Sequence, residues 1–145
     1  MLGQAQVCVP LLRLLPDWFG LEAGIRNYER EIGQQPTFLA KVGGNIRGFL
    51  TVKQHTPYSA ELFVMAVHPQ AHRLGIGRAL VQAAEAWARG LKIEYMQVKT
   101  LGPSRPDEGY AGTRAFYETM GFRPLEEFKQ IWDENNPCLI FVKRL

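Results

Sequence analysis

The chain has 145 residues, of which 46% are hydrophobic and 21% are charged, a composition typical of a soluble globular protein. No apolar run approaches the roughly 20 residues of a membrane span, and the N-terminal residues lack the pattern of a cleavable signal peptide. We therefore expect a single cytoplasmic domain over residues 1–145, with no membrane partner. The net charge of +3 is scattered along the sequence, so it mildly favours anionic ligands without predicting a nucleic-acid surface.

The predicted elements alternate along the chain without an internal repeat. The first half of the chain is predicted to form a strand (6–15), a helix (17–33), a hairpin (37–42 and 45–54) and a buried strand (60–67). The second half is predicted to form a helix (75–90), a strand (92–101), a helix (110–121) and two closing strands (122–132 and 138–145). Pro10 interrupts the first strand and suggests a sheet edge, while Gly43 and Gly44 mark the hairpin turn. Helical crossovers combined with hairpins predict an α/β (α+β) fold with a mixed sheet covered by helices.

The two cysteines, Cys8 and Cys138, each lie inside an apolar stretch, and neither belongs to a CxxC pair. Such surroundings predict reduced core thiols rather than a disulfide or a zinc site. We expect no bound metal.

The segment "MAVHPQAHRLGIGRAL", residues 65–80, runs from a strand through a glycine-containing loop into a helix. It lacks the GxxxxGK pattern of a P-loop, and Leu80 stands where a dinucleotide fingerprint needs its third glycine. A glycine-containing loop before a helix N-terminus still favours an anion, because the first N–H groups of the helix are free. Arg73 and Arg78 flank this position, so a pyrophosphate would fit it. The structural alternative is that Gly75 turns the chain and Gly77 allows close packing.

Two segments together resemble one family. "VHPQAHRLGIGRAL" is similar to the acyl-CoA binding motif of the GNAT superfamily of N-acetyltransferases, with Val67, Pro69, Gly75 and Gly77 at the matching positions. "TRAFYETMGFRPLEEF" is similar to the late motif of the same family, and the last strands, with "WDENNPCLIFVK", resemble those of a group of its small bacterial members. The resemblance implies the GNAT fold, a mixed, mostly antiparallel sheet of about six to seven strands flanked by about four helices.

The resemblance also implies which residues bind acetyl-CoA. Main-chain groups at the end of the strand would align the pantetheine arm and polarise the thioester carbonyl. The loop and the first helical turn would bind the pyrophosphate, and a tyrosine would contact the thiol end. The implied cofactor-binding residues are Met65, Ala66, Val67, His72, Arg73, Leu74, Gly75, Ile76, Gly77, Arg78 and Tyr117.

Acetyl transfer to an amine needs a base and an acid, because the ammonium must lose a proton and the departing thiolate must gain one. By the resemblance, Glu61 stands where relatives place a glutamate, and it could accept the amine proton directly or through water. Tyr117 stands at the usual general-acid position. The structural alternatives are a solvent-facing glutamate at a strand end and a tyrosine that packs beside Phe116.

These observations predict an N-acetyltransferase that moves an acetyl group from acetyl-CoA to a primary amine by direct transfer in a ternary complex. The acceptor would be a small molecule or a peptide, and the protein could act as a homodimer. The alternative is a non-catalytic regulatory module on the same fold that senses acyl-CoA or binds RNA. The sequence does not identify the acceptor, because one fold serves many acceptors.

Overall fold

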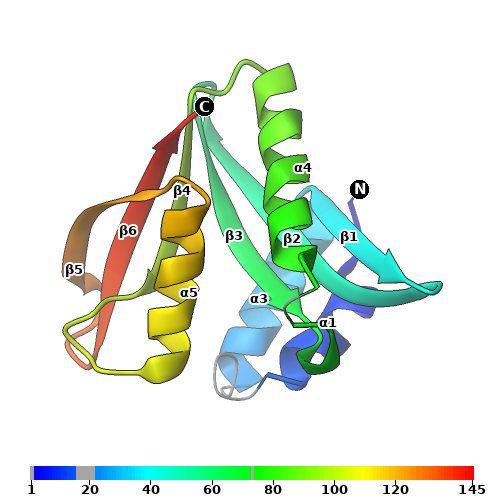
Figure 1. Ribbon diagram of the computed structural model, residues 1–145, viewed down its shortest axis with the longest axis horizontal. Helices are drawn as coiled ribbons and strands as arrows, with labels where there is room; N and C mark the ends of the chain where they lie inside the picture. Colours follow the sequence, from blue (N-terminus) through cyan, green and yellow to red (C-terminus); the bar gives the residue numbers. More distant parts are fainter. Residues whose placement is uncertain (1, 16–21, 73) are drawn as a thin grey trace. The chain divides into compact units, whose positions relative to one another are not determined.

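The computed structural model describes residues 2–15, 22–72 and 74–145. The helices are α1 (Ala5–Arg13), α3 (Glu22–Gln34), α4 (Ile76–Gly90) and α5 (Glu108–Thr119), with a short 3-10 helix, η1 (Pro69–Ala71). The strands are β1 (Thr37–Val42), β2 (Asn45–Thr56), β3 (Ser59–Val67), β4 (Tyr95–Leu101), β5 (Arg123–Asp133) and β6 (Asn136–Arg144). Among the described residues they form one six-stranded sheet in the order β1-β2-β3-β4-β6-β5 (Figure 1).

The sheet is mixed, as predicted. β3 pairs with β4 in parallel, whereas the pairs β1–β2, β4–β6 and β5–β6 are antiparallel. The strands and helices predicted from residue 37 onward all form, with their ends shifted by a few residues. The helix predicted over 17–33 forms over Glu22–Gln34, while residues 17–21 lie outside the described residues. The predicted α/β fold class is therefore confirmed.

The first element differs from the prediction, because most of residues 6–15 form the helix α1 and not an edge strand. Cys8, Leu11, Leu12 and Leu15 are the buried side chains, and their spacing is that of one helix face. Pro10 is exposed, so its missing N–H costs a helical hydrogen bond without disturbing the buried face. Burial of the apolar face outweighs the local cost of the proline.

Contacts between residues divide the chain into two compact units. The first unit comprises Met1–Lys53 and Leu62–Gly90, and the second comprises Gln54–Glu61 and Leu91–Leu145. The expectation of a single domain over residues 1–145 stays a prediction.

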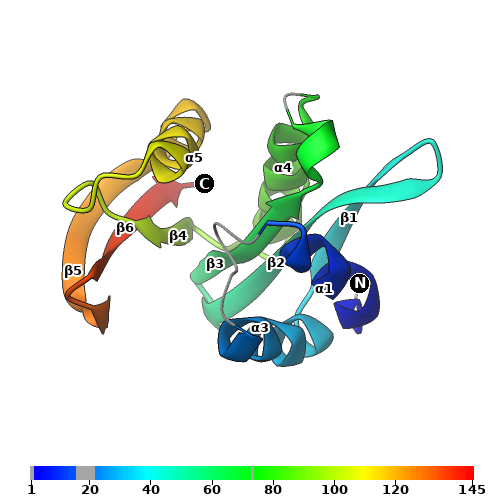
Figure 2. The ribbon, with the colours of Figure 1, turned by 90° about the horizontal axis from the view of Figure 1, so that it is seen from below.

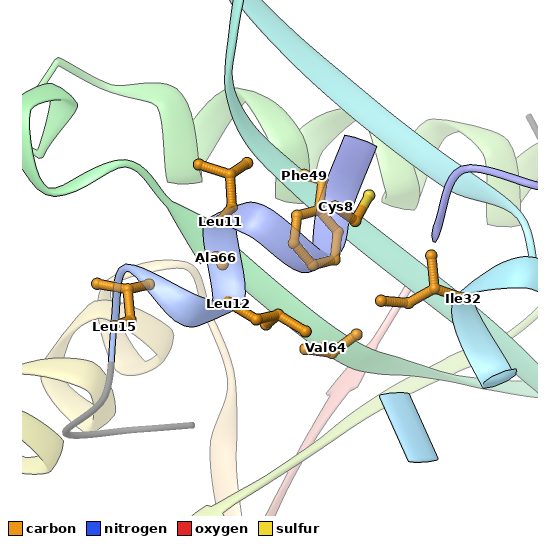
Figure 3. Packing of buried hydrophobic residues seen from close by; sticks show 8 residues of the cluster. All are labelled: Cys8, Leu11, Leu12, Leu15, Ile32, Phe49, Val64 and Ala66. Atoms are coloured by element: carbon orange, nitrogen blue, oxygen red, sulfur yellow. The ribbon is translucent and has the colours of Figure 1, made fainter. Parts of the chain in front are cut away.

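In the first unit, α1 and α3 cover one face of the strands and α4 covers the other (Figure 2). Side chains from α1, from Leu15 just after it, and from α3, β2 and β3 form a buried cluster (Figure 3). Its members are Cys8, Leu11, Leu12, Leu15, Ile32, Phe49, Val64 and Ala66. On the α4 side, a Cβ placed on Gly48 would lie only 2.9 Å from Cγ2 of Ile76. The absence of that side chain lets the start of α4 lie directly against β2.

In the second unit, α5 packs against β4. The Asp107 carboxylate caps α5 by accepting a hydrogen bond from Tyr110 N at 3.0 Å. The start of β3 belongs to this unit, where Ser59–Glu61 pairs with Tyr95–Gln97. None of the described helices, in either unit, is long and apolar enough to cross a membrane.

Candidate active site

The loop between β3 and α4 is shaped by hydrogen bonds within its own segment. Nδ1 of His68 accepts a hydrogen bond from Gln70 N at 3.1 Å and thereby caps η1. Nε2–H of His72 donates to the carbonyl oxygen of Val67 at 2.8 Å, because a carbonyl can only accept. His68 N donates to the carbonyl oxygen of Arg47 at 2.7 Å, which fixes the start of the loop to β2. His72 therefore supports the loop through its ring.

The end of this loop presents backbone rather than side chain. Gly75 has a φ of 78°, in the left-handed region that favours glycine, and among the described residues beyond its chain neighbours a Cβ added there would meet no atom within 4 Å. α4 begins at Ile76, and the N–H groups of its first turn have no acceptor within the helix. The helix dipole adds positive potential at the same end. Open space beside free N–H groups fits an anion such as a pyrophosphate.

The other predicted loop residues differ in their exposure. Leu74 and Arg78 are exposed, Gly77 is half-buried, and Ile76 is buried. Because Arg78 lies in the first turn of α4, its exposed guanidinium can pair with a phosphate bound there. Arg73 lies outside the described residues.

Met65, Ala66 and Val67 form the end of β3. The side chain of Ala66 is buried in the cluster of Figure 3, while Met65 and Val67 are half-buried. β3 pairs with β4 over Ser59–Glu61, and these three residues follow the paired segment along β3. Their side chains serve packing, and any contact with a ligand would fall to their main-chain groups.

Glu61 is buried in a cluster of ionisable side chains and does not face solvent. It is only 4% exposed, and its Oε1 lies 2.7 Å from Nε2 of His55 and 3.3 Å from Nζ of Lys99. The three residues come from β2, β3 and β4. Glu61 lies opposite Gln97 in the parallel register, and Lys99 follows two residues later on the same face of β4. Sequence analysis missed His55 and Lys99, because neither belongs to a motif.

Cys138 extends this cluster on β6. It lies opposite Leu101 of β4, and its thiol is fully buried. Burial raises the pKa of Cys138 to about 11, with Lys99 lowering the pKa and Glu61 raising it by smaller amounts. The thiol is therefore protonated near neutral pH and is no nucleophile there. Within the described ranges, no group of three His, Cys, Asp or Glu side chains is arranged to hold a metal ion.

Tyr117, in the last turns of α5, is 6% exposed. Its ring centroid lies 5.3 Å from that of Phe116, 5.8 Å from that of Phe122 and 6.2 Å from that of Phe141. Burial raises the pKa of the Tyr117 phenol well above its usual range, and the nearby Tyr110 raises it further. The phenol thus keeps its proton at physiological pH, which a proton donor requires. The packing predicted as the structural alternative is present, and it is compatible with a donor role.

The predicted site residues fall into two groups. Residues 65–67 and the described loop residues belong to the first unit, where backbone hydrogen bonds and helix α4 hold them together. Glu61 and Tyr117 belong to the second unit, where Glu61 lies in the ionisable cluster and Tyr117 lies among aromatic rings.

Residues 33–124 match the family model of the acetyltransferase (GNAT) domain, so the chain belongs to the GNAT acetyltransferase family. It is also 36% identical over 86 residues to the mycothiol acetyltransferase of Salinispora arenicola (strain CNS-205), covering 54% of this chain. The match covers 25% of that relative, so this chain corresponds to only a part of it.

Solved structures show the same fold. A GNAT-family protein from Desulfovibrio desulfuricans superposes with a TM-score of 0.84 at 18% identity, covering 97% of this chain and 91% of that one. A GNAT-family acetyltransferase from Elizabethkingia anophelis, solved with acetyl-CoA bound, has a TM-score of 0.72 at 19% identity, covering 92% and 89%. At these identities the likeness establishes the GNAT fold, which the sequence motifs predicted.

Proposed function

We propose that this chain is an N-acetyltransferase that moves an acetyl group from acetyl-CoA to a primary amine by direct transfer in a ternary complex. The observation that carries the proposal is the β3–loop–α4 segment of a chain that belongs to the GNAT family. There, Gly75 opens the space before the free N–H groups of a helix N-terminus.

The loop and the start of α4 would bind the pyrophosphate of acetyl-CoA. Main-chain N–H groups of residues 75–78 would donate to the phosphate oxygens, and the Arg78 guanidinium would add a charged pair. His72 would act through its hydrogen bond to Val67, which holds the loop in this conformation. The elongated arm of the co-substrate would follow the main chain of Met65, Ala66 and Val67 as an added strand does.

Acetyl-CoA supplies an acetyl thioester whose carbonyl carbon is attacked by the amine nitrogen, so that an amide forms and the carbon–sulfur bond breaks. A main-chain N–H at the end of β3 would donate to the carbonyl oxygen, where negative charge develops. Tyr117 would donate the proton of its phenol, which is protonated beforehand, to the departing sulfur. The second proton that the attacking nitrogen loses as the amide forms would restore the phenol, directly or through water.

The acceptor must lose a proton before it can attack, since an alkylammonium has no free electron pair. We propose that Glu61 belongs to the group that accepts this proton. Its carboxylate is held between an imidazole, His55, and an ammonium, Lys99, so it is fixed in place within the cluster. The acceptor itself would be a small-molecule or peptide amine.

We propose that the protein acts in the cytoplasm. Cys8 and Cys138 are both free thiols, which suits the reducing cytoplasm. We also propose that the protein can form a homodimer, which light scattering of the purified chain would test directly.

The proposed reaction is tested by mixing the purified chain with acetyl-CoA and a panel of amines, covering polyamines, amino acids, aminoglycosides and peptides. Release of free thiol above the level without amine, together with an acetylated product in mass spectra, is the expected result. Binding of acetyl-CoA without thiol release for any amine would favour a sensing module. An affinity for RNA that falls steeply with salt, without thiol release, would favour the RNA-binding alternative.

A further inference from the structure

Glu61 and His55 differ sharply in their access to solvent. The Glu61 side chain is 5% exposed, whereas that of His55 is 33% exposed. One carboxylate oxygen, Oε1, is engaged by both His55 and Lys99. A proton accepted by Glu61 would therefore sit on a buried carboxylate that already accepts hydrogen bonds from both of these side chains. The His55 imidazole, in contrast, reaches the surface.

The hydrogen bond between the two side chains determines the state of the imidazole. An ionised carboxylate can only accept, so Nε2 of His55 carries the hydrogen that is donated to Oε1 across 2.7 Å. A neutral imidazole with its hydrogen on Nε2 has an electron pair on Nδ1. Glu61 thus fixes both the tautomer and the orientation of a ring whose second nitrogen can act as a base.

The charges around the ring are compatible with this arrangement. The groups that face His55 through Glu61 are Lys99 from β4 and Cys138 from β6. The ammonium of Lys99 contacts the same carboxylate oxygen of Glu61 and compensates its negative charge. The thiol of Cys138 is neutral, because burial raises its pKa to about 11. In hydrolase triads a buried carboxylate likewise accepts a hydrogen bond from one imidazole nitrogen and leaves the other as the general base, although there the carboxylate bonds Nδ1–H and here it bonds Nε2–H.

We propose that His55 is the base that takes the proton of the acceptor ammonium, with Glu61 as its positioning carboxylate and Lys99 as the counter-charge. This inference rests on the proposed acetyl transfer and refines the role of Glu61 in it. The N–H bond of the ammonium breaks, an Nδ1–H bond forms directly or through one water, and the freed electron pair of the amine attacks the thioester. The imidazolium then releases its proton to solvent from the exposed side of the ring.

The test compares His55→Gln and His55→Ala with the wild type, using an amine that the wild type acetylates. Glutamine keeps a donor within reach of Glu61 but has no basic nitrogen, so kcat/KM should fall by about 10² to 10⁴ at neutral pH. Gln54→Ala is the matched control, because Gln54 is the exposed neighbour on β2 and its amide bonds the carbonyl oxygen of Thr56. This control should keep the wild-type rate.

Two further readouts separate a base from a structural residue. Added imidazole should restore part of the rate of His55→Ala, and it should not restore that of Glu61→Gln. The fall of log(kcat/KM) toward acid pH should flatten in His55→Gln, while its melting temperature and its affinity for acetyl-CoA stay at wild-type values. Ring ¹⁵N spectra should show the hydrogen of neutral His55 on Nε2 in the wild type and a mixture of tautomers in Glu61→Ala.

The outcomes are distinguishable. A wild type that acetylates no amine overturns the proposed function, and this inference falls with it. An active wild type with His55→Gln within threefold of its rate overturns the inference alone. In that case, a large loss in Glu61→Gln would return the base role to the carboxylate.

Discussion

At the residue scale, burial keeps three ionisable side chains neutral. Burial raises the pKa of Cys8 to about 12 and that of Cys138 to about 11, and it raises the pKa of Tyr117 above its usual range. Glu61 is buried as well, but its carboxylate is hydrogen-bonded to His55 and paired with the ammonium of Lys99. The sulfur and phenol groups therefore keep their protons, while the carboxylate is compensated by Lys99.

Both cysteines should resist alkylation in the folded protein. The thiolate is the reactive form, and at pH 8 the raised pKa values leave almost none of it, while burial covers both sulfur atoms. Iodoacetamide followed by mass spectrometry should detect no adduct on the native chain and two after denaturation in urea. Modification of the native chain at the denatured rate would contradict the burial of both thiols.

The same shifts predict how stability changes with pH. The unfolded thiols ionise near pH 9.0, whereas the folded ones hold their protons to about pH 11 and 12. The folded state then binds more protons than the unfolded state, so the free energy of unfolding should fall as pH rises above about 9. Cys8→Ala should weaken that fall in urea titrations between pH 9 and 11. An identical pH dependence in wild type and variant would show that Cys8 does not contribute.

Tyr117→Phe should lower turnover while leaving acetyl-CoA affinity unchanged. The ring contacts with Phe116, Phe122 and Phe141 remain in the variant, and only the hydroxyl that would donate to the leaving sulfur is lost. We expect kcat to fall about 10²-fold, within the usual range for loss of a general acid. Calorimetry with acetyl-CoA is the control for binding. An unchanged kcat with a verified amine would leave Tyr117 with a packing role alone.

At the element scale, the β3–loop–α4 segment combines a strand end, a hydrogen-bonded turn and a helix N-terminus. Its conformation depends on the left-handed backbone at Gly75 and on the close approach of β2 to α4 at Gly48. Gly48 and Gly75 both belong to the first unit, so single substitutions can test what holds the segment in this conformation.

Gly75→Leu should abolish acetyl-CoA binding while leaving the chain folded. The side chain would enter the open space that the phosphates would occupy, and the left-handed backbone would cost roughly 1–2 kcal/mol. Gly44→Leu is a matched control, because Gly44 has a φ of 84°, and its Cβ would also meet no atom within 4 Å. Both variants should lose similar stability in thermal melts, and only Gly75→Leu should lose binding in calorimetry. Equal affinities would place the pyrophosphate elsewhere.

At the scale of the whole molecule, a ligand that binds the folded chain alone shifts the unfolding equilibrium. Acetyl-CoA at ~100 times its Kd should stabilise the protein by about 2.7 kcal/mol, which corresponds to a rise in Tm of roughly 5–10 °C for a chain of this size. Acetyl-pantetheine, which lacks the pyrophosphate, should give a much smaller rise at the same concentration. Equal shifts for the two ligands would argue against phosphate recognition by the loop.

The first helix shows where sequence patterns mislead. Residues 6–15 contain β-branched valines, which favoured a strand locally, and Pro10 placed that strand at a sheet edge. The structure instead forms α1, whose buried side chains recur at helical spacing and pack against α3, β2 and β3. The local propensities were weak, and the burial of one apolar face against distant elements decided the outcome.

The sequence by itself determined the family, the sheet class and the loop that would bind acetyl-CoA. The family and the loop rest on residues close together in the chain, such as Val67 to Gly77, whose turn and helix-start chemistry can be recognised locally. The sheet class rests on the order of hairpins and helical crossovers along the chain. Only the tertiary structure decided the surroundings of Glu61. His55 and Lys99 reach it from two other strands, and Lys99 is separated from it by 38 residues. Such contacts depend on strand order and register, which side-chain alternation along one strand does not specify.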